Sequence, residues 1–142
     1  MLQTVKKCQF KTLGDDRGKL IALESLSEQV PFDVKRVYYI FDTMPGTIRG
    51  KHAHKKLKQV LICVSGSCVI RCDLGNGKTI EYLLNRPDQG LLLEGLVWRD
   101  MLQFSKDAIL LVLASDHYDE SDYIRNYNEF GKNIRKFQKE KT

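Results

Sequence analysis

The chain of 142 residues lacks any apolar run long enough to span a membrane, and its first residues, MLQTVKKCQF, lack the hydrophobic region of a signal peptide. It also lacks a Cys-x-x-Cys motif and any regular cysteine spacing. Three of its four cysteines, Cys63, Cys68 and Cys72, fall in or beside predicted strands, and we expect them to be small apolar core residues. These absences predict a cytoplasmic protein with no membrane partner.

Linkers, internal repeats, low-complexity segments and a helix-turn-helix pattern are absent too. At this length, we expect the chain to form a single domain over residues 1–142. The net charge of +5 suggests an anionic partner, but much of the excess lies in the basic stretch 132–141. Such a tail is more often solvated than bound to nucleic acid, so we expect no nucleic-acid partner.

Short β-prone runs fill most of the chain, and turns separate them about every ten residues. An Asn-Gly pair within LGNGK, residues 74–78, is typical of a β-hairpin turn. The predicted strands cover residues 5–12, 20–23, 34–41, 59–64, 67–73, 79–84, 90–93, 96–104 and 108–114. No helix is predicted before residue 119, and the pattern favours an all-β sandwich or barrel over about residues 5–115.

A different period marks the last part of the chain. Apolar residues recur there at alternating spacings of four and three, which forms one stripe on a helix. They are Tyr123, Tyr127, Phe130, Ile134 and Phe137. Acidic residues crowd the start of this segment and cations its end, as the helix dipole favours. We therefore predict a C-terminal α-helix over about residues 120–138 that packs against the barrel.

The most distinctive segment is a His-Ala-His sequence just before a predicted core strand. Side chains alternate along a strand, so His52 and His54 face the same way. One interpretation is a basic surface hairpin, because lysines follow the pair in HAHKKLK. We favour the other, a functional site, because two imidazoles at strand spacing lie between glycines and lead into a core strand.

A metal site needs further ligands, and the chain offers few. A set of three histidines and one carboxylate would need an acid five residues after His54 and a third histidine near position 99. Those positions hold Gln59, which has no charge, and Arg99, a fixed cation that would repel a metal ion. The remaining histidine, His117, follows the last predicted strand and is expected in a loop. We therefore expect neither a metal nor another cofactor.

Without a metal, two imidazoles in a partly buried pocket suit proton transfer, because the ordinary pKa of histidine is close to neutral. Four arginines lie in or beside strand ends and suit bidentate binding of a phosphate: Arg17, Arg36, Arg49 and Arg99. Each of them, taken singly, is better explained as a surface charge. Tyr38 and Tyr39 alternate along a strand, so at most one of them faces the site.

Four segments of the chain together resemble one family closely. They are KRVYYIFDT, RGKHAHKKLKQVLICVSGSC, GLLLEGLVWRDM and LVLASDHYDESDYIRNYNEF, and the resemblance covers about residues 5–130. The family is that of the dTDP-sugar 3,4-ketoisomerases, which are metal-free cupins. The resemblance implies a cupin jelly-roll barrel, a homodimer with exchanged N-terminal strands, and a dTDP-linked 4-keto-6-deoxyhexose as substrate. It also implies that the keto group moves from C4 to C3 through an enediol.

The same resemblance implies roles for particular residues. His52 would move the carbon-bound proton and His54 the oxygen-bound proton, and the reverse order stays open. Tyr39 and Arg49 would stabilise the charge of the enediolate. The residues expected to bind the substrate are Arg17, Arg36, Gln59 and Arg99.

Two other functions stay open. A 3,5-epimerase would act on a related dTDP-4-keto-sugar, but it generally needs acid–base groups on both sides of the ring, whereas both histidines lie on one strand. A non-catalytic sugar-nucleotide-binding cupin would bind the ligand without turnover. Family members carry either histidine or arginine after the tryptophan, here Trp98-Arg99, and they differ in the C4 configuration of the product, which stays open too.

Overall fold

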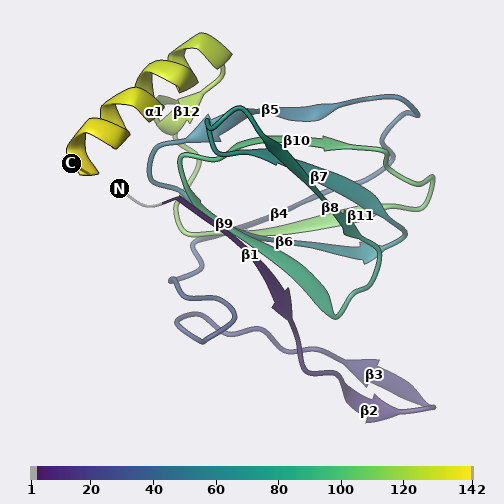
Figure 1. Cartoon of the computed structure of the whole chain (residues 1–142). Coiled ribbons are helices and arrows are strands. Elements are labelled where there is room, and N and C mark those ends of the chain that lie inside the picture. The colour runs from purple at the N-terminus through teal and green to yellow at the C-terminus, as the bar shows by residue number, and fades with distance from the viewer. Residues whose placement is uncertain (1–2, 142) are drawn as a thin grey trace.

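The computed structural model describes residues 3–141 and consists mainly of two antiparallel sheets that face each other (Figure 1). The first sheet contains, in spatial order, β1 (Gln3–Gln9), β9 (Gln89–Gly95), β6 (Lys58–Ser65), β11 (Ile109–Ala114) and β4 (Arg36–Ile40). The second contains β12 (Tyr123–Ile124), β5 (Arg49–His54), β10 (Trp98–Leu102), β7 (Cys68–Asp73) and β8 (Thr79–Leu84). Neighbours such as β1 and β9 lie far apart in sequence, and the crossovers between the sheets build a jelly roll. The predicted all-β class is confirmed.

Apolar side chains from both sheets meet between them and form the main core. Leu61 and Leu91 of the first sheet and Ile70 of the second are fully buried there. The same core holds Cys63, Cys68 and Cys72 as free thiols, which confirms the role expected of them. Burial of this apolar surface is the main stabilising contribution to the fold.

The N-terminal part differs from the prediction in one respect. No strand was predicted between residues 12 and 20, but this segment contributes to a hairpin of β2 (Leu13–Asp15) and β3 (Gly18–Leu20). The carboxylate of Asp15 accepts a hydrogen bond from the backbone N–H of Arg17 at 3.0 Å, which closes the turn tightly enough for two strands to pair. Within the described residues, β2 and β3 pair only with each other, and the hairpin extends away from the barrel (Figure 1).

The C-terminal helix is confirmed, but its predicted start near residue 120 is wrong. A 3₁₀ turn (Glu120–Asp122) comes first, then β12, and α1 (Tyr127–Lys141) begins only after Asn126. The side-chain oxygen of Asn126 accepts a hydrogen bond from the backbone N–H of Glu129 at 3.1 Å, as a helix N-cap does. Tyr123 therefore lies in a strand, because pairing with the edge of β5 satisfies its backbone better than an earlier helix start.

One face of α1 packs against the outer side of the second sheet. The buried helix residues Phe130, Ile134 and Phe137 pack with Ala53 of β5 and with Leu96. These three side chains belong to the predicted stripe, whereas Tyr127 is about half exposed. Among the described residues, no helix is long and apolar enough to cross a membrane.

We expect Phe130→Ala to lower the free energy of unfolding by roughly 3–5 kcal/mol, because it leaves a cavity where an aromatic ring was buried. Phe130 is only 1% exposed. Lys136→Ala, on the exposed side of the same helix, is the control and should change the free energy by less than about 0.5 kcal/mol. Denaturant unfolding measures both variants, and equal small effects would show that α1 does not dock on the barrel.

Candidate active site

A bulge in β5 positions the two histidines. The register between β10 and β5 shifts by one residue, since Arg99 lies opposite His52 but Asp100 opposite Gly50. Gly50 and Lys51 both have positive φ, at 82° and 54°. A Cβ on Gly50 would lie 2.9 Å from the carbonyl oxygen of Arg99, so this position needs glycine. The bulge turns the end of the strand so that His52 and His54 project inward.

His52 is held as a neutral base. Its Nδ1–H donates to the carbonyl oxygen of Gly50 at 3.0 Å, because a carbonyl can only accept. Nε2 is therefore the unprotonated nitrogen. Burial, and then the positive charge of Arg99, lower the pKa of His52 to about 3. At neutral pH, the lone pair on Nε2 is free to accept a proton.

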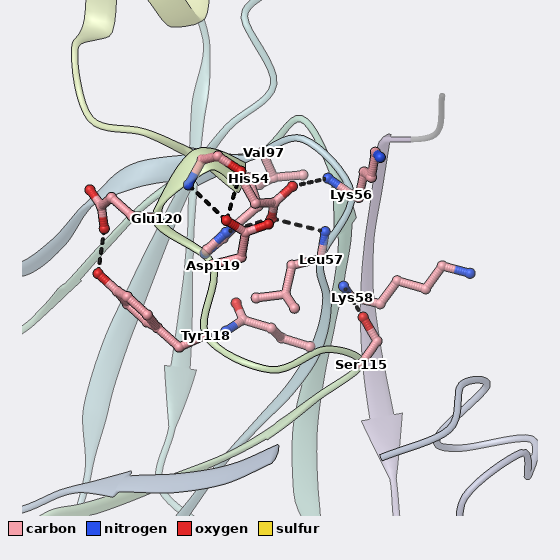
Figure 2. A network of polar contacts seen from close by, with 12 residues as sticks. His54, Lys56, Leu57, Lys58, Val97, Ser115, Tyr118, Asp119 and Glu120 are labelled. Atoms are coloured by element: carbon pink, nitrogen blue, oxygen red, sulfur yellow. Dashed lines mark hydrogen bonds and ion pairs between the residues drawn. The ribbon is translucent and has the colours of Figure 1, made fainter. Parts of the chain in front are cut away.

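His54 lies beside it in a different polar environment. The two imidazole centroids are 4.8 Å apart and nearly perpendicular, at 83°. Nδ1 of His54 is 3.1 Å from Oδ2 of Asp122, and Nε2 is buried without a hydrogen-bond partner among the described residues. Burial lowers the pKa of His54 to about 4, although the carboxylate of Asp122 acts in the opposite direction. The contact with Asp122 is therefore a hydrogen bond from a neutral imidazole, and Figure 2 shows the polar network around it.

Tyr123 covers both imidazoles. Its ring centroid lies 4.3 Å from that of His54 and 5.0 Å from that of His52. The guanidinium of Arg125 lies 4.2 Å from the centroid of the same ring and pairs with Glu120 at 2.6 Å. From the sequence, Tyr123 was assigned to the apolar stripe of the helix and was therefore missed as a site residue. The signal that was present is the SDYIR sequence, whose isoleucine and tyrosine also fit a short strand.

Arg99 is a buried cation next to the histidines. It is 1% exposed, and its hydrogen bonds go to the carbonyl oxygen of Val97, at 3.1 and 2.9 Å, and to Oε1 of Gln59, at 2.5 Å. Nε2 of Gln59 in turn donates to the hydroxyl of Tyr38 at 3.0 Å.

Within residues 3–141, no three His, Cys, Asp or Glu side chains gather closely enough to hold a metal ion. The two positions that a metal site would require hold the Gln59–Arg99 pair, whose positive charge opposes metal binding.

The histidines line two neighbouring cavities. One, of about 540 Å³, is lined by His52, Tyr38 and Arg49 among others, and the second, of about 480 Å³, by His54. Arg36 and Tyr123 belong to the walls of both. The Nε atom of Arg36 is buried without a hydrogen-bond partner among the described residues, so its guanidinium has capacity left for an anionic ligand.

Most of the residues predicted for the site gather here, with two exceptions. Tyr39 is 61% exposed on the outer face of β4, because alternation along the strand directs Tyr38 inward instead. The expected placement of Tyr39 beside the histidines is therefore wrong, and Tyr38 lines the cavity of His52 instead. Arg17 lies in the β2–β3 hairpin with a side chain that is 90% exposed, paired with Asp15 at 2.9 Å. His117 lies in a loop, as expected, at the second cavity.

A jelly-roll barrel whose inward-facing imidazoles line two adjoining cavities is the arrangement of a cupin. The family model described as FdtA: WxcM-like, C-terminal matches residues 3–135. The chain belongs to this family. Together with the named relatives that follow, this match confirms the resemblance to sugar 3,4-ketoisomerases stated from the sequence and the cupin fold that it implied.

Named relatives agree with this assignment. The TDP-4-oxo-6-deoxy-alpha-D-glucose-3,4-oxoisomerase of Aneurinibacillus thermoaerophilus is 50% identical over 136 residues, which is 96% of each chain. The structure of the WlaRB TDP-quinovose 3,4-ketoisomerase from Campylobacter jejuni is 52% identical, with a TM-score of 0.86 and coverage of 92% of this chain and 99% of that one. A histidine variant of the 3,4-ketoisomerase QdtA from Thermoanaerobacterium thermosaccharolyticum, in complex with TDP-4-keto-6-deoxyglucose, is 44% identical, with a TM-score of 0.90 and coverage of 96% and 97%.

The lowered pKa values predict how stability depends on pH. The unfolded chain binds more protons than the folded one wherever the pH lies below the ordinary histidine pKa of about 6.5 and above the folded value. Stability is therefore lost as the pH falls. When the pH falls from about 7 to about 5, the protonation of each of His52 and His54 in the unfolded chain should lower the free energy of unfolding by roughly 1–2 kcal/mol.

Denaturant unfolding at a series of pH values measures this loss, and His52→Asn should decline less steeply than the unmodified protein. A variant that keeps the full pH dependence would show that His52 takes up its proton in the folded state at an ordinary pKa.

Proposed function

We propose that the chain is a 3,4-ketoisomerase that converts dTDP-4-keto-6-deoxyglucose to its 3-keto isomer. The observation that carries the proposal is the pair of neutral imidazoles, 4.8 Å apart on one strand, which line two adjoining cavities. Moving a ketone to the neighbouring carbon transfers two protons, one between carbons and one between oxygens. Two proton carriers side by side match that requirement.

The steps balance without a cofactor. Nε2 of His52 removes the proton from C3, and the electron pair of that bond forms the C3–C4 double bond while the negative charge moves to O4. His54 takes the proton from the hydroxyl at O3 and delivers it to O4. The charge on O3 then re-forms a carbonyl at C3, and C4 takes its proton back from His52.

Positive charge around the cavity supports this chemistry. The guanidinium of Arg99 is buried next to His52, where its fixed positive charge would stabilise negative charge that develops on the substrate oxygens. Arg49 and Tyr38 line the same cavity as His52, and Tyr38 takes the place first expected of Tyr39. Arg36 is the strongest candidate to bind the diphosphate, because it lies in both cavity walls with an unused buried donor. Gln59 contributes to substrate binding indirectly, because it accepts a hydrogen bond from Arg99 and orients that guanidinium.

We further propose a homodimer in which N-terminal strands exchange between copies. The β2–β3 hairpin has no strand partner among the described residues, and an isolated two-stranded hairpin is marginally stable in water. Leu13 and Leu20 on it are about half exposed. An apolar groove of about 700 Å³ runs beside it, walled in part by Val64 and Leu111. A second copy of the chain would cover these surfaces and bring Arg17 to a cavity that it does not reach in its own chain.

The cytoplasm is the proposed location, because all four cysteines are free and buried, as in proteins of a reducing compartment. The expected partners are thus a nucleotide sugar and a second copy of the chain.

Incubation of the EDTA-treated protein with dTDP-4-keto-6-deoxyglucose, followed by NMR of the products, tests the function. We expect the 3-keto isomer and incorporation of solvent deuterium at the carbons that exchange protons. A product with altered configuration at C5 would indicate the epimerase. A substrate that binds but stays unchanged would indicate the non-catalytic cupin. Activity that is lost with EDTA and restored by a divalent ion would contradict the metal-free mechanism.

The two histidine variants should fail differently. His52→Asn should abolish both turnover and deuterium exchange at C3, whereas His54→Asn should still wash deuterium slowly into C3 while making little product. Each should reduce turnover by roughly 10²–10⁴-fold, the range for general acid–base catalysis. Mild, equal losses with weaker substrate binding would mean that the pair only contacts sugar hydroxyls.

Complementation tests the dimer together with Arg17. Arg17→Ala and His52→Asn should each be nearly inactive alone. If they are unfolded and refolded together, half of the dimers are mixed, and each mixed dimer regains one intact site, so about a quarter of the original activity should return. Refolding each variant alone is the control. No recovery from the mixture, with sedimentation giving the mass of a single chain, would contradict both proposals.

A further inference from the structure

Asp122 is not among the residues that the sequence indicated for the site, yet its carboxylate touches the catalytic pair. It ends the 3₁₀ turn, and its side chain is 15% exposed. Oδ2 lies 3.1 Å from Nδ1 of His54. The same carboxylate accepts the backbone N–H groups of Lys56 at 2.8 Å and of Leu57 at 3.3 Å, and Figure 2 shows both contacts.

We propose that Asp122 is a positioning residue that holds His54 in the tautomer with its proton on Nδ1 and stabilises the imidazolium that forms during the oxygen-to-oxygen transfer. The assignment of that transfer rests on the proposed function. The placement of the proton does not, because it follows from the hydrogen bonds of the carboxylate alone.

The chemistry of the carboxylate determines which nitrogen carries the proton. Burial raises the pKa of Asp122, but hydrogen bonds from His54 and from the backbone of Lys56 outweigh burial and hold it below its ordinary value. The group is therefore ionised and can only accept hydrogen bonds. Nδ1 of His54 must then donate. Nε2 is left with its lone pair, buried and without a partner among the described residues, and the wall of the cavity includes His54.

The charges around His54 explain why a carboxylate is needed. Arg99 and Arg36 both act against a positive charge on this imidazole, and Asp122 acts in its favour. His52 differs, because its Nδ1–H donates to the uncharged carbonyl of Gly50. The two imidazoles are thus equipped differently: only His54 has an anion in contact to compensate a transient positive charge.

The variant that tests this is Asp122→Asn. Asparagine keeps the size of the side chain and, with its oxygen on the N–H of Lys56 at the shorter backbone contact, turns its amide group toward Nδ1 and away from accepting the longer contact from Leu57. The amide group would then donate to Nδ1, which favours the proton of His54 on Nε2. Turnover should fall by roughly 10²–10⁴-fold with little change in KM, because a proton carrier is lost and no substrate contact. Deuterium exchange at C3, the task of His52, should fall much less, so the ratio of exchange to product formation should rise.

Asp73→Asn is the matched control. Asp73 is also buried, at 7% exposure, and accepts the N–H of Gly75 at 2.6 Å and the hydroxyl of Tyr127, on the side of the barrel that faces α1. It should leave the ratio of exchange to product formation unchanged. A fall of both rates in proportion in Asp122→Asn, as from partial unfolding, would overturn the proposal.

Nitrogen-15 NMR of the histidine rings gives a measurement that needs neither a variant nor activity. In the unmodified protein, His54 should show a protonated Nδ1 and an unprotonated Nε2, and Asp122→Asn should reverse this. A proton on Nε2 in the unmodified protein would overturn the proposal even if the variant failed to fold. If the protein makes no 3-keto product, the proposed function fails, and the ring spectra alone still decide whether Asp122 sets the tautomer.

Discussion

The pairing of β12 with β5 is the contact on which the site depends. Tyr123 lies opposite His54 and Ile124 opposite Ala53, so two residues of the C-terminal segment extend the second sheet at the strand that carries both histidines. This places the ring of Tyr123 over the imidazoles and Asp122 at Nδ1 of His54. Ile124 joins the buried contacts of α1. A single edge contact therefore connects the packing of the helix with the geometry of proton transfer.

Arg99 imposes the second constraint. Removing a cation from water costs several kcal/mol, and here its hydrogen bonds go to the oxygens of Val97 and Gln59, not to a carboxylate. Such a residue contributes poorly to stability, but in the proposed mechanism its charge would be in place before negative charge develops on the substrate. Burial first, and then the same charge, lower the pKa of His52, which keeps that imidazole unprotonated at neutral pH. In the proposed mechanism, one buried cation would thus favour both the neutral base and the anionic intermediate.

Local patterns in the sequence were sufficient for most of the strands, for the buried part of the helical stripe and for the shared face of the two histidines, because all three follow from backbone periodicity. They were insufficient wherever a contact between residues far apart in the sequence determines where a side chain lies. Alternation shows that Tyr38 and Tyr39 face opposite ways, but only packing of the two sheets shows which one faces inward. Tyr123 fits the helical spacing equally well, and only its pairing with His54 makes it a strand residue. Asp122 lies far from His54 in sequence, so their hydrogen bond leaves no local pattern.

The central claim is that His52 works on the carbons of the hexose and His54 on its oxygens. A crystal structure with the equilibrium mixture of dTDP-4-keto-6-deoxyglucose and its 3-keto isomer tests it most directly. In this mechanism the hexose does not move during the reaction, so C3 of both isomers should occupy one position in the site and C4 of both isomers another. The account predicts C3 and C4 within about 3–3.5 Å of Nε2 of His52, the separation of reacting atoms in a near-attack geometry. It also predicts O3 and O4 at hydrogen-bond distance from Nε2 of His54. A hexose bound with C3 and C4 away from both imidazoles would contradict it.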